Sequence, residues 1–194
     1  MYRQQKSWNK KDTTEYQDIN IRIFTQPNGL QLKEYDGKVK KPAVVAKNNK
    51  GEKITSKDYT VKYAAGCKNV GTYTVKVTFK GDYKGTFTKT FNINPKGTSL
   101  SKVKAARKSF SATWKKQSKQ TSGYQLQYST NKKFAKSVKT CTISKNTTVK
   151  KTVKKLSAKK TYYVRVRTYK TVKVGKKSVK IYSGWSAAKK VKTK

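Results

Sequence analysis

The sequence predicts an all-β protein made of two tandem antiparallel β-sandwiches. Apolar and polar residues alternate with a period of two in several short segments, as in half-buried strands. Turn-forming Gly, Asn and Asp residues separate these segments at spacings typical of sandwiches. Aromatic residues form 11% of the chain while hydrophobic residues reach only 34%, so a few large rings must fill small cores. We therefore expect a folded protein despite its high charge.

Strands in the first half are the easiest to assign. Residues 59–63, 72–79 and 86–93 each place apolar side chains on one face and Thr or Lys on the other. Turn chemistry accompanies them at Asn28-Gly29, Asp36-Gly37, residues 49–51, Gly81-Asp82 and Gly85. The regular succession of short strands and turns indicates a first sandwich.

A break in the pattern follows at residues 94–99, where Pro and Gly end the last strand and the acidic residues disappear. We expect proteolysis to cut first there or within residues 1–26. Beyond the break, strands are expected at residues 110–114, 124–128 and 162–167. In the last of these, Tyr162 and every second residue after it face one way, and the intervening residues face the other.

The residues of the second half are similar to those of a fibronectin type III module. Trp114 stands at the family's strand-B Trp, Tyr124 and Tyr128 at its strand-C tyrosines, and Leu156 with Tyr162 at its tyrosine corner. The resemblance implies that these five residues are core residues. Residues 158–159 are Ala-Lys where the family usually has Pro-Gly.

The first half resembles a bacterial immunoglobulin-like repeat. The cues are Tyr35-Asp36-Gly37, Pro42, residues 58–61, residues 69–73 and residues 81–86. The segments 182–186 and 191–194 also resemble strand G of Lys-rich modules in Gram-positive surface proteins. We therefore divide the chain into an N-terminal arm or upstream remnant (1–26), an immunoglobulin-like domain (27–95) and a fibronectin type III domain (96–194).

Charge is unevenly distributed along the chain, which carries 49 Lys and Arg against 8 Asp and Glu, a net charge of +41. All the acids precede residue 83, so residues 97–194 carry 29 basic side chains and no acidic one. Such a region depends on counterions or a polyanion for neutralisation. Nearly all the cations are Lys, whereas Arg is the usual reader of bases and phosphates, so no specific nucleic-acid binding is expected.

Missing residue types argue against catalysis. The chain has no His, which removes a Ser-His-Asp triad and the common zinc sites. Cys67 and Cys141 fall in different predicted domains, so they are expected to be free thiols. Residues 175–178 superficially resemble a phosphate loop but lack the upstream Gly and a following helix, which favours a hairpin turn. We expect no enzyme, cofactor or metal.

The family resemblance implies that the A–B, C–C′ and E–F loops share the end of the second sandwich that lies farther from the first. We call this the distal end. Its basic residues are the candidate polyanion-binding site: Arg107, Lys108, Lys132, Lys133, Lys155, Lys159 and Lys160. Like charges that gather without an acid repel one another, which favours an anionic ligand.

Together these features predict a non-catalytic, monomeric module that associates with anionic cell-wall polymers or glycans through Lys-rich faces. The resemblance implies a secreted or cell-surface location, and no leader peptide is recognised in this chain. No stretch is apolar enough to span a membrane. Two alternatives stay open. The chain could be an inert spacer or enzyme appendage whose charge serves solubility, or an adhesin for host glycan or protein.

Overall fold

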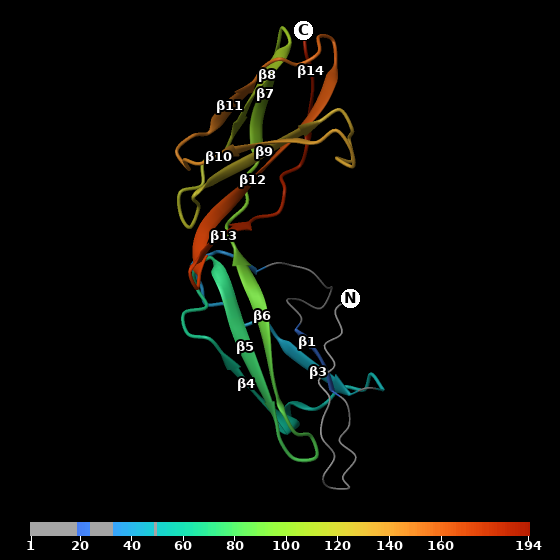
Figure 1. Cartoon of the computed structure of the whole chain (residues 1–194), viewed down its shortest axis with the longest axis vertical. Helices are drawn as coiled ribbons and strands as arrows, with labels where there is room; N and C mark the ends of the chain where they lie inside the picture. Colours follow the sequence, from blue (N-terminus) through green and yellow to red (C-terminus); the bar gives the residue numbers. More distant parts are fainter. Residues whose placement is uncertain (1–18, 24–32, 49) are drawn as a thin grey trace.

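The computed structural model describes residues 19–23, 33–48 and 50–194. The regular elements in these ranges are strands, apart from one short 3₁₀ turn, η1 (Ser56–Asp58). Figure 1 shows the strands gathered in two elongated groups, one above the other. The all-β fold class predicted from the alternation is confirmed. The described ranges contain no helix that is long and apolar enough to cross a membrane.

The described residues of the N-terminal part, which ends at Asn94, form two sheets. Its four-stranded sheet runs in the order β2 (Lys33–Glu34), β6 (Thr86–Asn94), β5 (Gly71–Phe79) and β4 (Tyr59–Tyr63). The β2–β6 pair is parallel, an exception to the antiparallel pairing that we expected throughout. A second sheet pairs β1 (Ile19–Ile23) with β3 (Val44–Asn48). The predicted arm over residues 1–26 therefore contains a strand.

Within the described ranges, the N-terminal part contains two separate apolar clusters. One consists of five buried residues, Ala46, Ile54, Tyr59, Val77 and Phe79. The other consists of three, Cys67, Phe91 and Ile93. Aromatic side chains dominate the contacts, as expected for a small core with few aliphatic residues. The expected turn at Asn28-Gly29 and the tryptophan at position 8 lie outside the described residues.

The C-terminal part is a sandwich of two sheets. The smaller sheet contains β11 (Lys150–Val153), β8 (Ser109–Trp114) and β7 (Leu100–Ala106). The larger contains β10 (Lys139–Ile143), β9 (Gly123–Ser129), β12 (Thr161–Val174), β13 (Lys177–Tyr182) and β14 (Lys189–Lys192). Strand β12 is long enough to pair with β14 along its first residues and with β13 along its last.

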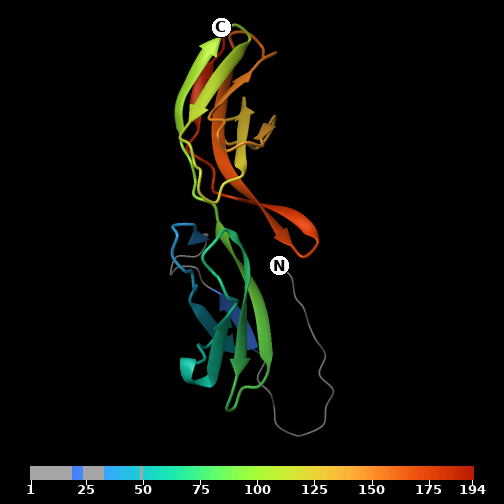
Figure 2. The same cartoon turned by 90° about the vertical axis from the view of Figure 1, so that its left-hand side faces the viewer.

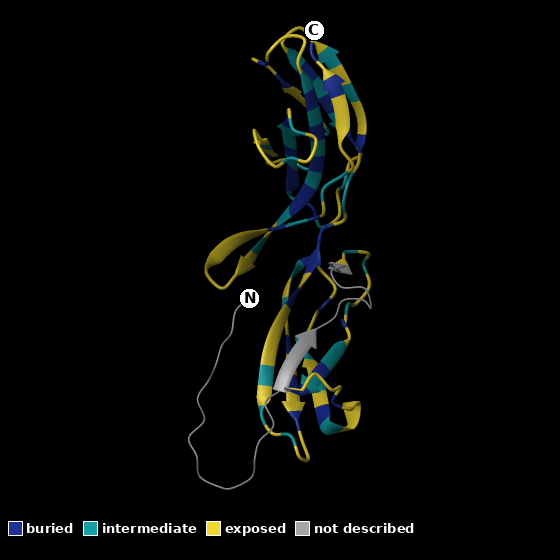
Figure 3. Cartoon of the chain, turned by 90° about the vertical axis from the view of Figure 1, so that its right-hand side faces the viewer, coloured by how far each residue is buried: buried dark blue, intermediate teal, exposed yellow. Residues whose placement is uncertain are grey.

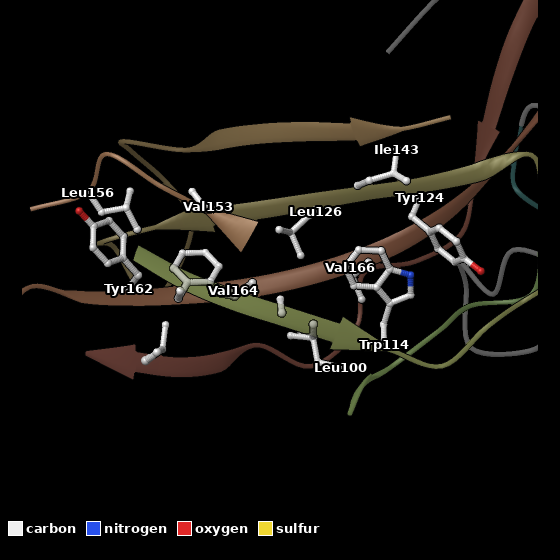
Figure 4. Packing of buried hydrophobic residues seen from close by; sticks show 13 residues of the cluster. Leu100, Trp114, Tyr124, Leu126, Ile143, Val153, Leu156, Tyr162, Val164 and Val166 are labelled. Atoms are coloured by element: carbon white, nitrogen blue, oxygen red, sulfur yellow. The ribbon is translucent and has the colours of Figure 1, made fainter. Parts of the chain in front are cut away.

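One continuous core of 13 buried residues lies between these two sheets (Figure 4). Trp114 packs on Tyr124 with ring centroids 5.4 Å apart. At the other end of the core, Phe110 packs against the rings of Tyr128 and Tyr162. The expected alternation in β12 is confirmed, because Tyr162 and the second and fourth residues after it are buried while their neighbours are half-buried.

Side chains bridge the gap between β13 and β14 along the edge of β12. The hydroxyl of Ser183 accepts the backbone N–H of Thr168, and the hydroxyl of Ser186 accepts that of Val166, both at 3.0 Å. Their own backbone N–H groups donate to the carbonyls of the same two residues. The two serines thus bond the β12 backbone on the side away from β9, in the gap that neither β13 nor β14 covers, as buried backbone groups require.

The expected linker at residues 94–99 joins the two parts of the molecule (Figure 2) and forms hydrogen bonds to both. Pro95 is fully buried, and the carbonyl of Lys96 accepts a 2.8 Å hydrogen bond from the Thr168 hydroxyl. The N–H of Gly97 donates to the carboxylate of Glu34. A further contact joins Gln120, whose amide oxygen accepts the N–H of Val70 at 3.3 Å. The Pro-Gly segment is therefore more ordered than its composition suggests.

Candidate functional site

The distal end is held together by backbone hydrogen bonds among three segments distant in sequence. The N–H of Lys108, in the β7–β8 turn, donates to the carbonyl of Lys194 at 2.9 Å. The carbonyl of Lys108 accepts the N–H of Leu156, in the loop between β11 and β12, also at 2.9 Å. In return, the N–H of Lys194 donates to Ala106. The turn, the loop and the C-terminal residues thus form one connected surface.

Thr193 connects the last of these segments to the β11–β12 loop. Its hydroxyl donates to the carbonyl of Ser157 at 2.7 Å and accepts the N–H of Lys160 at 3.0 Å. The hydroxyl of Tyr162 accepts the N–H of Ser157 at 3.3 Å, which is the hydrogen bond expected of a tyrosine corner. These bonds fix the backbone from which the loop lysines project.

Three of the candidate lysines adopt left-handed backbone conformations. Their φ angles are 46° for Lys108, 59° for Lys155 and 52° for Lys159. This region favours Gly, and it costs other residues on the order of 1 kcal/mol. Backbone geometry therefore gives no reason for Lys at these positions.

Lys132 and Lys133 lie in a separate loop, between β9 and β10. The carboxamide oxygen of Asn131 accepts the N–H of Lys133 at 2.9 Å, and the hydroxyl of Ser129 donates to the carbonyl of Lys136 at 2.7 Å. Since Ser129 pairs with Tyr163 near the start of β12, this loop leaves the large sheet at the distal end. It shares that end with the β11–β12 loop.

All seven predicted residues are exposed: Arg107, Lys108, Lys132, Lys133, Lys155, Lys159 and Lys160. Backbone and side-chain hydrogen bonds connect the segments that carry five of them, whereas Lys132 and Lys133 belong to the neighbouring loop. No acidic side chain exists between residues 97 and 194, so none from that range can neutralise them. Their combined field therefore extends into solvent over the Debye length, roughly 8 Å at physiological salt.

The structure also contains an arginine–aromatic stack that the sequence analysis did not identify. The guanidinium of Arg167 lies between the rings of Tyr182 and Trp185, at 3.9 and 4.2 Å from their centroids. The guanidinium of Arg165 lies between Trp185 and Phe134, at 4.6 and 4.0 Å. The stack connects the β13–β14 segment to the loop that carries Lys132 and Lys133.

Two glutamines on β9 orient the stacked arginines. Gln127 accepts two hydrogen bonds from Arg165, and Gln125 accepts two from Arg167, at 2.7–3.0 Å. Each Gln lies directly opposite its Arg in the β9–β12 register. Burial lowers the pKa of both guanidinium groups, which nevertheless stay charged. The sequence signal was the Gln pair and the Arg pair, each with a spacing of two on a predicted strand; that the two strands are neighbours is a finding of the structure.

The predicted core residues lie in the C-terminal core. Trp114, Tyr124, Leu156 and Tyr162 are buried, and Tyr128 is half-buried against them. The indole N–H of Trp114 is buried without a hydrogen-bond partner. Cys67 lies buried in the N-terminal part and Cys141 lies half-buried in β10, both as free thiols.

Comparison with known families identifies the C-terminal part. The fibronectin type III domain model matches residues 94–183. Residues 94–183 form a fibronectin type III domain. The sheet of this fibronectin type III domain continues beyond the match, because β14 pairs with the start of β12. Fibronectin type III domains are typically non-catalytic and commonly extracellular or surface-exposed.

Solved structures that are similar to this chain share little sequence with it. The chicken CNTN1 FN1–FN3 domains are 17% identical with a TM-score of 0.43, covering 90% of this chain and 54% of that one. Domains A168–A170 from titin are 16% identical, with a TM-score of 0.35 and coverages of 90% and 66%. A two-domain fibronectin type III segment from chicken tenascin is 15% identical, with a TM-score of 0.41 and coverages of 95% and 89%. No curated protein sequence matches the chain.

Proposed function

We propose that this chain is a non-catalytic module that associates with anionic cell-wall polymers or glycans through the distal end of its fibronectin type III domain. The observation that carries the proposal is the connected surface built from the β7–β8 turn and the β11–β12 loop. It presents Arg107, Lys108, Lys155, Lys159 and Lys160 on a backbone fixed by hydrogen bonds. No acidic side chain of the domain neutralises it.

The backbone conformation of three lysines supports a functional role for their charge. Lys108, Lys155 and Lys159 occupy turn positions where Gly would relieve backbone strain. Solubility alone could be served by Lys on any exposed strand face, without that cost. Uncharged residues of the same domain also adopt this conformation, so the support comes from the gathering of the three lysines at one end and not from the backbone angle alone.

The chemistry of Lys suits a polymer of repeated anionic groups. An ammonium group is a compact, hydrated point charge on a flexible stem, so it follows phosphate or carboxylate groups without demanding one geometry. Such binding is driven by the release of counterions and weakens steeply as salt rises. We therefore propose diffuse recognition of a polyanion, with teichoic acid as the cell-wall example.

The test compares two variants that lose the same charge. One replaces Lys132, Lys133, Lys155, Lys159 and Lys160 with Gln. The control replaces five exposed lysines on separate segments: Lys57, Lys68, Lys80, Lys104 and Lys145. Binding of the full chain to purified teichoic acid is measured from 0.05 to 0.5 M salt. We expect the distal variant to lose about tenfold more affinity than the control near 0.15 M salt, with a shallower salt dependence.

A second variant separates binding from stability. Replacing Lys108, Lys155 and Lys159 with Gly removes three charges at positions where the backbone favours Gly. We expect its thermal midpoint to stay within a few degrees of the unmodified protein while its affinity for teichoic acid falls. Equal losses in the distal and scattered variants would overturn the distal site. No retention of the unmodified chain at 0.15 M salt would favour a spacer.

A further inference from the structure

The hairpin formed by the end of β12 and the start of β13 projects beyond the sandwich at the opposite end from the candidate site. Figure 3 shows it standing out beside the junction of the two parts, coloured mostly as exposed. Its turn contains Gly175 with φ of 60°, which confirms the hairpin predicted at residues 175–178. From Thr171 to Lys180, every residue except Val172 is exposed.

One face of this hairpin is apolar. Val172 pairs with Val179, and Val174 pairs with Lys177, and antiparallel partners lie on the same face of a sheet. Val174 is 49% exposed and Val179 is 43% exposed. The opposite face carries Thr and Lys at Thr171 and Lys180. The hairpin is therefore an amphipathic ribbon whose valine face lacks the cover that a core would give.

Lysines surround the valine face. Lys170 lies at the base of that face, Lys177 lies near its tip, and Lys176 lies in the turn. Lys173 and Lys180 add charge from the other face, and the Lys180 ammonium lies 5.2 Å from the Tyr169 ring. Long lysine stems can cover apolar surface while their charged ends reach outward. The ribbon thus offers apolar contact at its centre and positive charge at its margin.

We propose that this hairpin binds the surface of an anionic lipid bilayer with its valine face against the acyl boundary. A polar polyanion would neutralise the lysines but leave the valines in water. A lipid surface satisfies both, because anionic headgroups attract Lys and the boundary beneath them accepts apolar side chains. The inference does not depend on the proposed polymer site, which lies at the distal end.

The position of β13 limits the depth of this binding. It is the edge strand of its sheet, so its outer backbone groups have no strand partner among the described residues. Unpaired backbone groups are not tolerated in the hydrocarbon core. The hairpin therefore lies at the interface, where water and headgroups can bond the outer edge of β13.

The test measures co-sedimentation of the full chain with vesicles of equal parts phosphatidylglycerol and phosphatidylcholine. The central variant is V174T/V179T, which keeps β-branched side chains suited to strands and preserves every charge. Its matched control is V39T/V138T, which changes the other two exposed valines. We expect the hairpin variant to partition onto these vesicles about tenfold less than the control. The unmodified chain should not bind vesicles of pure phosphatidylcholine.

Charge variants separate this inference from the polymer site. K170Q/K176Q/K177Q removes charge beside the valines, and K132Q/K155Q/K160Q removes as much at the distal end. We expect the hairpin triple to lower vesicle partition by roughly a hundredfold and the distal triple to lower it much less. Soluble polyphosphate should bind V174T/V179T and the unmodified chain equally.

Two outcomes would overturn the proposal. One is equal vesicle binding by V174T/V179T and its control, which would mean that the valines contact no lipid. The other is equal loss in the two lysine triples, which would indicate attraction by net charge alone. Circular dichroism and the thermal midpoint of each variant establish that it is folded before binding is compared.

Discussion

The two parts of the molecule are both built from β-strands, but their buried cores are organised differently. The fibronectin type III domain places 13 buried residues in one continuous cluster, whereas the described residues of the N-terminal part form clusters of five and three. Yet the domain with the larger core is the one without any acidic residue. Apart from Arg165, Arg167 and Lys170, its cations are exposed. The packing of the core therefore offsets a repulsion among charges that lie outside it.

The parts also differ in how they stabilise their turns. In the N-terminal part a carboxylate stabilises a turn. Asp36 accepts hydrogen bonds from the backbone N–H of Lys38 and from the ammonium of Lys40. The hydrogen bond from Lys40 lowers the pKa of Asp36. In the fibronectin type III domain neutral acceptors take this role. Asn131 holds the β9–β10 loop and Thr193 holds the distal end. Neutral acceptors leave the surface purely cationic, which is the difference that the proposed function requires.

The largest effect that separates the two cores is expected from Phe110→Ala. Phe110 is fully buried between Tyr128 and Tyr162, so its loss leaves a cavity and should lower the free energy of unfolding by about 3–5 kcal/mol. Its counterpart in the N-terminal part is Phe87→Ala, a half-buried ring beside Phe79, for which about 1–2 kcal/mol is expected.

Urea unfolding of both variants measures this contrast. Circular dichroism reports on all strands. Tryptophan fluorescence reports on Trp8, Trp114 and Trp185, and a Trp8→Phe background confines it to the two tryptophans of the C-terminal part. The contrast fails if Phe87→Ala costs as much as Phe110→Ala, because the N-terminal clusters would then be as tightly packed as the larger core.

The reaction rates of the two thiols provide a second comparison of the two parts, with an effect of intermediate size. Burial raises the pKa of Cys67, which is 2% exposed, so less of its reactive thiolate is present at any given pH. Cys141 is half-buried in β10. We expect Cys67 to react with iodoacetamide at least about tenfold more slowly than Cys141 at pH 8. Mass spectrometry of peptides over time gives both rates, and equal rates would show that the N-terminal part opens readily.

The smallest effect concerns the tyrosine corner. Tyr162→Phe removes the hydroxyl that accepts the Ser157 N–H, and should cost about 1 kcal/mol. Tyr163→Phe, on the opposite face of β12, is the control and should be nearly neutral. A thermal melt of each variant gives the difference. An unchanged midpoint for Tyr162→Phe would mean that the 3.3 Å hydrogen bond contributes nothing to the corner.

Alternation was enough to place the central strands. The segment predicted at residues 59–63 coincides with β4, and those at 72–79 and 86–93 differ from β5 and β6 by one residue at one end. Strand β12, however, extends seven residues beyond the predicted end at Arg167. Its last residues mix Lys and Thr with Val, so hydrophobicity fades while pairing with β13 continues. Pairing partners, which one strand's pattern does not contain, decide where such a strand stops.

The features of the candidate site that were not predicted from the sequence all depend on contacts between residues distant in the chain. The family topology predicted that the basic loops share one end, but not that Lys108 bonds both Lys194 and Leu156. The arginine–aromatic stack likewise needs the register that sets Arg165 opposite Gln127. The predicted linker at residues 94–99 is bonded through partners as distant as Thr168. Composition alone carries no information on such partners.

The central claim is that the polyanion contacts the distal end, and the most direct measurement locates the contact residue by residue. The full chain, labelled with nitrogen-15, is titrated with a short glycerol-phosphate oligomer at 0.15 M salt, and the backbone amide shifts are followed by NMR. The account predicts saturable shifts concentrated at residues 107–108, 132–133 and 155–160, with little change in β4 to β6. Shifts spread evenly over all exposed lysines, or centred on the β12–β13 hairpin, would contradict it.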